Sequence, residues 1–238
     1  MFSSPIFFCS ICGGREHNFG KVLSRNLIEE WQLSPCEVEY IDRQQGQFCS
    51  SCGSNLRSIA LSNAIRSFLG THFLLRDISN NKTYKSLRIL EINEAGMLTP
   101  YLKCFPNYVY AAYPEVDMHS LPYFDGSFNL VVHSDTLEHI PNPIHALCEC
   151  RRVLKLDGAL CFTVPTIVGR LTKNRDGIAP SYHGDPSVKA SDHVVHTEYG
   201  ADVWTHLMLA GFTDVVINSV QYPSALALTA RNTSQVLS

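Results

Sequence analysis

The chain has 238 residues, of which 45% are hydrophobic and 17% are charged. That length suffices for one substantial hydrophobic core and a small appended module. Its 19 basic and 22 acidic residues give a net charge of -3, so no overall electrostatic field draws it to nucleic acid or to an anionic membrane.

The first residues read "MFSSPIFFCSICGG" and lack the basic start and long apolar run of a secretory signal. No run approaches the ~18 apolar residues that cross a bilayer. We therefore expect a cytoplasmic protein without a membrane partner. In a reducing compartment its nine cysteines are metal-bound or free rather than disulfide-bonded.

Two Cys-x-x-Cys pairs, each followed by a glycine, are the most specific motif of the N-terminal part: Cys9, Cys12, Cys49 and Cys52. A two-residue gap lets both thiolates of a tight turn face one ion, and the glycine permits the turn. Four thiolates leave no open position for substrate, so the predicted zinc ion is structural. Two unrelated cysteine pairs or a redox dithiol are the alternatives, although no βαβ pattern surrounds either pair.

The segment "EVEYIDRQQGQF" before the second pair reads as a strand and turn, as a zinc ribbon would supply. We accordingly predict a zinc-ribbon-like module over residues 1–55. The remaining cysteines are interpreted as small packing residues: Cys36, Cys104, Cys148, Cys150 and Cys161.

A helix is predicted next, because apolar residues recur at helical spacing and Gly70 follows them: Leu61, Ala64, Ile65 and Phe68. Arg57 and Arg66 on this helix are expected to face solvent or an acidic ligand. The polar run that follows is read as a linker, so residues 56–86 form a connecting helix and linker before a domain over 87–238.

From residue 87 onward, strand-like and helix-like segments alternate. The predicted strands are "LRILEIN", "YVYAAY", "SFNLVVH", "ALCFTVP", "TDVVINSV" and "PSALALTA". The predicted helices are "TPYLKCF", "PIHALCECRRVLKLDG" and "YGADVWTHLMLAGF". In the last helix the expected buried residues are Val203, Trp204, Leu207 and Met208, with Gly211 at its end.

This alternation predicts an α/β fold with a doubly wound, mostly parallel sheet. No helix separates the last two strands, which can therefore pair as an antiparallel hairpin. In such sheets, ligands bind outside the carboxyl ends of the strands, where the strand order reverses.

The stretch "DMHSLPYFDGSFNLVVHSDTLEHIPNPIHALCECRRVLKLDGALCFTVP" resembles the core of class I S-adenosylmethionine-dependent methyltransferases of type 11. The resemblance covers roughly residues 87–230. It implies a Rossmann-like, seven-stranded sheet with an antiparallel last strand. The paired cysteines resemble a bacterial subset with a zinc-binding N-terminus, and the segment at about 166–198 resembles that subset's substrate-covering insert.

The resemblance places the S-adenosylmethionine site at the turn after "LRILEIN". Family members carry a glycine-rich turn there, whereas this chain has one displaced glycine. Asn93 tolerates left-handed backbone and Ala95 is small, so the turn is expected to survive in a wider form. The residues assigned to it are Glu91, Asn93, Glu94, Ala95 and Gly96, with both carboxylates toward the cationic methionine end.

The other cofactor contacts are also assigned by resemblance. The family's ribose-binding acid falls on Ala112, so Glu115 is a candidate substitute and Tyr113 a stacking residue. Asp117 is expected to accept a hydrogen bond from the adenine amine and Met118 to cover the ring. A loop-capping role is the alternative for Asp117.

Methyl transfer to a hydroxyl needs an acceptor held in line and a group that takes its proton. Histidines suit the second task near neutral pH, and the candidates are His133, which also counts as a cofactor contact, His183 and His196. His193, Tyr182 and Asp192 lie in the same polar segment, where a second metal site and plain solvent exposure are the alternatives. Glu138 and His139 match the family's Leu-Glu-His, with a structural or a catalytic role.

Two functions stay open from the sequence. The first is a methyltransferase acting on a small-molecule or glycan-like hydroxyl. The second is a catalytically silent methyltransferase-like domain that binds a protein or RNA partner. The degenerate turn and the missing ribose acid favour the second. The intact block after Asp117 and the histidine-rich segment favour the first, and the retained carboxylates decide for activity.

Overall fold

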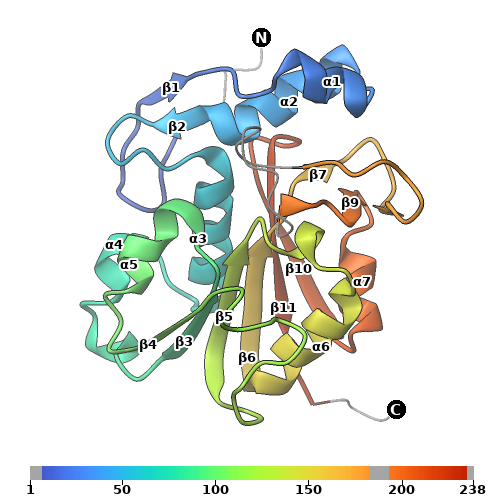
Figure 1. Ribbon diagram of the computed structural model, residues 1–238. Helices are drawn as coiled ribbons and strands as arrows, with labels where there is room; N and C mark the ends of the chain where they lie inside the picture. Colours follow the sequence, from blue (N-terminus) through green and yellow to red (C-terminus); the bar gives the residue numbers. More distant parts are fainter. Residues whose placement is uncertain (1–6, 183–192, 235–238) are drawn as a thin grey trace.

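The computed structural model describes residues 7–182 and 193–234, and its centre is a β-sheet with helices on both faces (Figure 1). Within those residues the sheet has six strands in the order β10-β11-β6-β5-β3-β4. Their bounds are β3 Arg88–Ile92, β4 Asn107–Ala111, β5 Phe128–Ser134, β6 Leu154–Thr163, β10 Asp214–Val220 and β11 Ala225–Arg231. The described sheet therefore has one strand fewer than the seven that the resemblance implied.

The strand directions agree with the doubly wound prediction. Strand β3 pairs in parallel with both β4 and β5, and β5 pairs in parallel with β6. Strand β11 runs antiparallel to β6 and to β10, so the last two strands form the expected hairpin. The chain passes from β3 to β4 on one side and then returns to β5 on the other, which places the switch point at β3 and β5.

Helices cover the two faces as separate layers. One layer packs through α3 and its neighbours, whose bounds are α3 Leu56–Phe68, α4 Leu75–Ile78, η1 Lys82–Tyr84, η2 Gly96–Leu98 and α5 Thr99–Leu102. The other layer packs through α6 and α7, and the bounds there are η3 Leu137–His139, α6 Pro143–Val153 and α7 Trp204–Leu209. Burial of apolar residues on both faces explains why the parallel strands read as continuous apolar runs.

Helix α3 forms as predicted and packs against β6, β10 and β11. Its buried residues include Leu61, Ala64 and Ile65, and Gly70 ends it with φ of 60°. It therefore forms part of the sheet's covering layer. The division of the chain into domains stays a prediction.

Helix α7 is shorter than predicted, and only part of its expected buried face is buried. Val203 and Leu207 lie in the core, whereas Trp204 and Met208 are exposed. The burial of the last two residues was wrongly predicted, because a helix of six residues presents only about one turn of its surface to the sheet. Gly211, with φ of 87°, follows its end as expected.

The segment between the cysteine pairs is mostly helical. Its elements are β1 His17–Phe19, α1 Arg25–Glu30, α2 Pro35–Gly46 and β2 Gln47–Cys49, with β1 and β2 antiparallel. The strand and turn predicted before Cys49 are thus wrong, except for β2. Ser34 caps α2 by accepting from the Glu37 N–H, and the Glu37 side chain accepts from the Ser34 N–H. This capping box starts a helix that the alternation of apolar residues concealed.

A small sheet lies between β6 and α7 in the chain. Its strands are β7 Thr166–Ile167, β8 Lys173–Asn174 and β9 Thr197–Gly200, in the order β7-β9-β8. The N-terminal helices and this small sheet both lie beside the carboxyl ends of the central strands in Figure 1. The segments that can enclose a ligand there thus come from both ends of the chain.

Candidate functional site: a four-cysteine cluster and a cavity at the sheet edge

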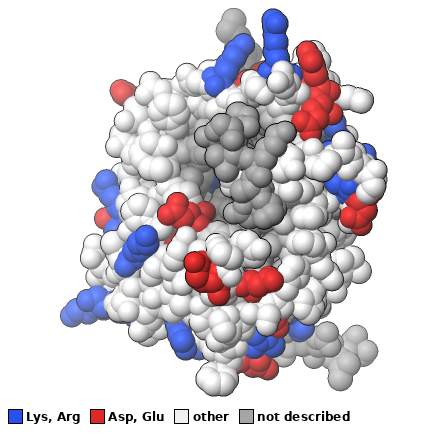
Figure 2. Space-filling model, in the orientation of Figure 1, with Lys and Arg blue, Asp and Glu red and all other residues white. Residues whose placement is uncertain are grey.

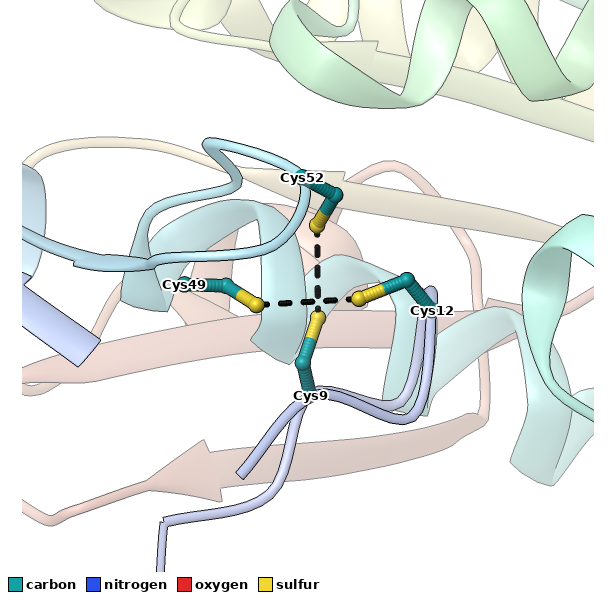
Figure 3. Close-up of side chains that lie close together, drawn as sticks. All are labelled: Cys9, Cys12, Cys49 and Cys52. Carbon is teal, nitrogen blue, oxygen red and sulfur yellow. Dashed lines mark hydrogen bonds between the residues drawn. The ribbon is translucent and has the colours of Figure 1, made fainter. Parts of the chain in front are cut away.

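The four paired cysteines converge on one point, as Figure 3 shows. Their sulfur atoms all lie within 4.8 Å of one another, with Cys9 Sγ 3.7 Å from Cys52 Sγ and Cys12 Sγ 3.6 Å from Cys49 Sγ. A tetrahedral zinc ion with Zn–S bonds of ~2.3 Å has S···S edges of roughly 3.8 Å. The cluster therefore has the dimensions of a Cys₄ zinc site, and the predicted grouping of these cysteines is confirmed.

The backbone of the two turns also fits a metal site. Gly13 and Gly53 follow the second cysteine of each pair and have φ of 83° and 74°, which residues with a side chain rarely adopt. The Gly14 N–H donates to Cys12 Sγ at 3.4 Å. These turns direct both sulfur atoms of each pair toward one point.

The other cysteines divide into two groups. Cys150 and Cys161 are buried as predicted, whereas Cys36, Cys104 and Cys148 are exposed. The packing role predicted for those three is wrong, since they lie on outward surfaces of their segments. Within the described parts of the chain, the four paired cysteines are the only group of potential ligands that could hold a metal ion.

A cavity of about 1000 Å³ opens at the carboxyl ends of the central strands. It lies at the upper end of the size range of ligand pockets. The residues that follow β3, β4 and β5 contribute Asn93, Tyr113, Asp117, His119, Asp135, Thr136, Glu138 and His139. The cavity therefore occupies the switch point at which doubly wound sheets bind their ligands.

The opposite wall of the cavity belongs to the segment between the cysteine pairs. Its apolar and aromatic residues are Val22, Leu23, Leu27, Trp31, Leu33 and Ile41, and its polar ones are Ser24, Asn26, Glu30, Gln44 and Gln45. Arg170 holds this wall by donating to Glu37 Oε1 at 2.7 Å and to the carbonyl oxygens of Trp31 and Gln32. Trp31 Nε1 donates to Ser181 Oγ at 2.9 Å. The wall is thus fixed to the chain that follows β6.

The turn after β3 keeps the left-handed residue that its sequence predicts. Asn93 has φ of 54° and lines the cavity. Its Oδ1 accepts from the Tyr113 N–H at 3.1 Å, and its Nδ2 donates to Thr136 Oγ1 at 3.4 Å. One side chain therefore links the ends of β3, β4 and β5.

Glu91 is fully buried and does not line the cavity. Its carboxylate accepts from the Ala95 N–H at 2.7 Å, from Tyr108 Oη at 2.5 Å and from Thr99 Oγ1. Burial and the hydrogen bond to this carboxylate raise the pKa of Tyr108, so the phenol stays protonated and donates. Glu91 thus stabilises the turn from below.

The rest of the turn is displaced from the cavity lining. Glu94 and Gly96 are exposed, Ala95 is buried, and none of the three lines the cavity. Gly96 has φ of 56°. Of the five residues predicted at this turn, the structure brings only Asn93 to the cavity.

Asp117 and Met118, which were predicted to contact the adenine together, have different surroundings in the structure. Asp117 lines the cavity and accepts from the His119 N–H at 2.8 Å, a hydrogen bond that lowers the pKa of the Asp117 carboxyl. Met118 is buried in the core and does not line the cavity, because the two side chains diverge. Tyr113 is exposed and lines the cavity, whereas the exposed Glu115 does not.

A partly buried ion pair lies at the end of β5. Arg57 Nη1 of α3 is 2.5 Å from Asp135 Oδ1, and the two side chains are 8% and 35% exposed. Asp135 has φ of 49°, and both residues line the cavity. Of the two alternatives expected for Arg57, the solvent-facing one is wrong, because its guanidinium pairs with an acidic side chain of this chain, Asp135.

Glu138 lines the cavity beside this pair and is only 1% exposed. Neither of its carboxylate oxygens has a hydrogen-bond partner among the described residues, and His139 Nε2 stays 3.6 Å from Oε1. Burial and the nearby Asp135 carboxylate raise the pKa of Glu138 well above its ordinary value.

Comparison with known families gives a match between residues 88–162 and the family model described as a methyltransferase domain. This span runs from β3 into β6 and includes the turn after β3, Asp117 and the Asp135 to His139 segment. The chain contains a methyltransferase domain. Comparison with curated sequences finds no significant match.

Solved structures of low similarity include a carbon methyltransferase, CurJ, at 12% identity and a TM-score of 0.44, covering 88% of this chain and 70% of that one. A SAM-dependent methyltransferase from Methanosarcina mazei has 11% identity and a TM-score of 0.39, covering 63% and 93%. One from Thermotoga maritima has 13% identity and a TM-score of 0.38, covering 73% and 99%. These values are too low to support an argument about substrate.

The histidines predicted for catalysis occupy different surroundings in the methyltransferase domain. His133 is fully buried, stacks on Phe162 with 4.8 Å between ring centroids, and does not line the cavity. Burial lowers the pKa of His133 to about 3. The structure thus places it in the core instead of at the acceptor position, since the alternation of β5 turns it under α6 and α7.

Histidines on the segment after β8 do reach the cavity. His193 and His196 line it together with Tyr182. The His196 N–H donates to the Glu138 carbonyl oxygen at 2.8 Å, which joins this segment to η3. His183 and Asp192 lie outside the described residues.

Several cavity residues were not assigned to the site from the sequence. Trp31 and the apolar residues around it belong to a segment that was read as part of a metal module. Arg57 and Asp135 lie 78 residues apart in the chain, so only the fold pairs them. The one available signal was Arg57 itself, a charged residue among the apolar ones of its helix.

Within the described residues, no helix combines the length and apolar character needed to cross a membrane. Figure 2 shows acidic residues toward the middle of the face in view and basic residues around its edge. A surface that binds phosphate groups concentrates lysine and arginine instead. The visible face of the molecule lacks that pattern among its described residues.

Proposed function

We propose that this chain transfers a methyl group from S-adenosylmethionine to a hydroxyl group of a small-molecule or glycan-like acceptor. The observation that carries the proposal is the cavity at the switch point, which the ends of β3, β4 and β5 share with the N-terminal segment. When bound, the cofactor supplies a methyl group on a cationic sulfur. The protein's own task is to hold two molecules in line and to exclude water.

The cofactor is expected at the end of the cavity formed by Asn93, Tyr113 and Asp117. Tyr113 offers an exposed ring for stacking, and the ionised Asp117 offers an acceptor for an exocyclic amine. The left-handed Asn93 keeps the turn after β3 open to this end. No carboxylate at the end of β4 lines the cavity among the described residues, so the ribose contacts differ from the family pattern.

The acceptor is expected against the N-terminal wall. Trp31 and the leucines beside it present apolar and aromatic surface, which suits a ring that carries a hydroxyl group. The acidic centre of the face in Figure 2 gives no support for a nucleic-acid acceptor. We infer that the four cysteines bind one structural zinc ion beside this wall.

Isothermal titration calorimetry with S-adenosylmethionine and its demethylated product tests the proposal. We expect micromolar binding of both to the wild-type chain and at least a tenfold loss in Asp117→Asn, which replaces an anionic acceptor with a neutral amide. Glu115→Gln is the matched control, because Glu115 is exposed nearby and does not line the cavity. An absence of binding at millimolar cofactor would refute the proposed enzymatic function. The catalytically silent domain would then remain as the alternative.

A further inference from the structure

An unpartnered, buried carboxyl group at the wall of a large cavity needs a ligand. Burying a carboxyl without hydrogen bonds costs stability, so native proteins keep such groups mostly where they serve binding or chemistry. Glu138 is 1% exposed, lines the cavity, and has two unsatisfied oxygens among the described residues. It is the least satisfied acidic side chain of the site.

The position of Glu138 suits contact with an acceptor. It lies on η3, directly after Thr136, which accepts a hydrogen bond from Asn93 on the cofactor side. On the other side, η3 is joined to the segment after β8, because the His196 N–H donates to the Glu138 carbonyl. Glu138 therefore lines the same cavity as Asn93 of the expected cofactor end and as Trp31 of the wall where the acceptor is expected.

The surrounding groups leave this carboxyl without a cation of its own. The nearest guanidinium, that of Arg57, is already paired with Asp135. The titratable and charged groups around the carboxyl, from all the elements packed on it, are Arg57, Asp135, His139, His196 and Tyr199. None of them donates a hydrogen bond to its oxygens, so a hydroxyl group from a ligand would be the first donor.

We propose that the Glu138 carboxyl group binds the acceptor's hydroxyl and takes up its proton during methyl transfer. This inference rests on the proposed function. The acceptor's O–H bond breaks and its proton passes to a Glu138 carboxylate oxygen. The acceptor oxygen forms a bond to the methyl carbon while the carbon–sulfur bond breaks, and that electron pair stays on sulfur, which becomes neutral.

The first test needs no acceptor. It measures whether the Glu138 side chain stabilises or destabilises the folded chain. If it is a ligand-binding group, Glu138→Gln should raise the melting temperature of the zinc-loaded chain by at least about 2 °C at pH 8 and by less at pH 5. The reason is linkage: a carboxyl whose folded-state pKa is raised loses stability as the pH rises above its unfolded value of ~4.3. An equal drop in melting temperature at both pH values would show a structural role and overturn the proposal.

The second test uses phenol and methyl α-D-glucopyranoside as probes of an aromatic and a glycan hydroxyl. Saturation-transfer NMR with the demethylated cofactor present should show binding of at least one probe, with at least a tenfold loss in Glu138→Met. Glu138→Gln should retain binding, because an amide oxygen still accepts a hydrogen bond. If the wild-type chain binds neither probe, or if Glu138→Met binds as well as the wild type, the assignment is wrong.

The third test measures transfer of labelled methyl groups to the bound probe. Glu138→Gln should slow transfer at least 100-fold, while cofactor affinity by calorimetry stays within twofold. Unchanged transfer, no transfer by the wild-type chain to a bound probe, or a tenfold loss of cofactor affinity in the variant would each overturn the proposal. A wild-type chain that fails to bind cofactor would instead refute the proposed function, and the melting test of Glu138 would still stand.

Discussion

Arg57 shows how one residue sets the electrostatics of the cavity. Its guanidinium is almost fully buried in a helix whose other buried residues are apolar apart from Ser58 and Ser62, and Asp135 is its partner at 2.5 Å. Taking two charges out of water is costly, and the cost is offset only when both partners are present. The pair therefore fixes α3 to the end of β5 at the point where the cavity begins.

Removing one partner of this pair should destabilise the chain. Asp135→Asn leaves the Arg57 charge buried and unpaired, and we expect a loss of roughly 2 kcal/mol in urea unfolding, below the 3–5 kcal/mol of fully buried pairs because Asp135 is 35% exposed. The control is Asp214→Asn, since Asp214 pairs with Arg231 on the surface at 3.8 Å. That variant should change stability by less than ~1 kcal/mol; an equal effect would contradict the special role of the Arg57 pair.

Single residues were predictable where local backbone decides, and unpredictable where distant partners decide. Asn93 was expected to be left-handed from its own side chain, and it is. The buried position of Glu91 depends on hydrogen bonds from Thr99 and from Tyr108 of the next strand. No local sequence pattern reveals these partners. His133 was predicted as a proton acceptor and cofactor contact although it is fully buried, since a one-residue change in a strand exchanges the two faces.

At the scale of elements, α2 is a helix that the sequence pattern did not predict. It also helps to hold the cavity wall. The sequence "EVEYI" alternates as a strand does, but the capping box of Ser34 and Glu37 starts a helix of 12 residues. Glu37 also accepts from Arg170 beyond β7. The same carboxylate thus caps a helix and ties it to a distant segment.

This double use makes the helix sensitive to acid. Arg170 lowers the pKa of Glu37 to about 2, so its stabilising contribution is complete above the unfolded pKa of ~4.3 and is lost as the pH falls from there toward 2. Glu37→Gln should cost on the order of 2 kcal/mol at pH 7, with a difference that vanishes near pH 2 in denaturant unfolding. Glu39→Gln, exposed on the same helix, is the control; a pH-independent loss in Glu37→Gln would contradict the ion-pair explanation.

The central strands were the most predictable elements, because strands buried on both faces are continuous apolar runs bounded by polar turns. All six predicted strands are present, including the hairpin of β10 and β11. The prediction of a seventh strand rested on the family resemblance alone, because the sequence analysis found no seventh apolar run. The small sheet of β7, β8 and β9 was not predicted, because strands of two to four residues carry almost no periodic signal.

At the scale of the whole molecule, the cysteine cluster and the cavity are parts of one arrangement. The chain leaves the cluster after Cys12, builds the apolar wall, and returns at Cys49. Arg170 and Ser181 hold the wall from the far end of the chain. The segment that was predicted as part of a metal module therefore also lines the cavity.

This continuity predicts a specific response to metal removal. Elemental analysis should find about one zinc per chain, with loss of the metal in Cys49→Ser and none in Cys36→Ser, whose cysteine is exposed outside the cluster. In a Trp204→Phe background, Trp31 is the only tryptophan, and chelation should shift its emission as the wall loosens. The central sheet should persist in far-ultraviolet circular dichroism.

Two results would contradict this coupling. A folded chain that never binds metal would contradict the predicted zinc site. A Trp31 emission that chelation leaves unchanged would show that the cavity wall does not depend on the metal. The wild-type chain with its zinc is the reference in both measurements.

The 36 residues between Cys12 and Cys49 form a closed loop once a metal joins its ends. On the chain-entropy scale used for disulfides, closing a loop of that size removes freedom worth on the order of 4 kcal/mol from the unfolded state. Unlike a disulfide, this cross-link is reversible and survives in a reducing environment. Under the proposed function, acceptor binding would therefore depend on the zinc concentration: at low zinc, the loop would open while the central sheet stays folded.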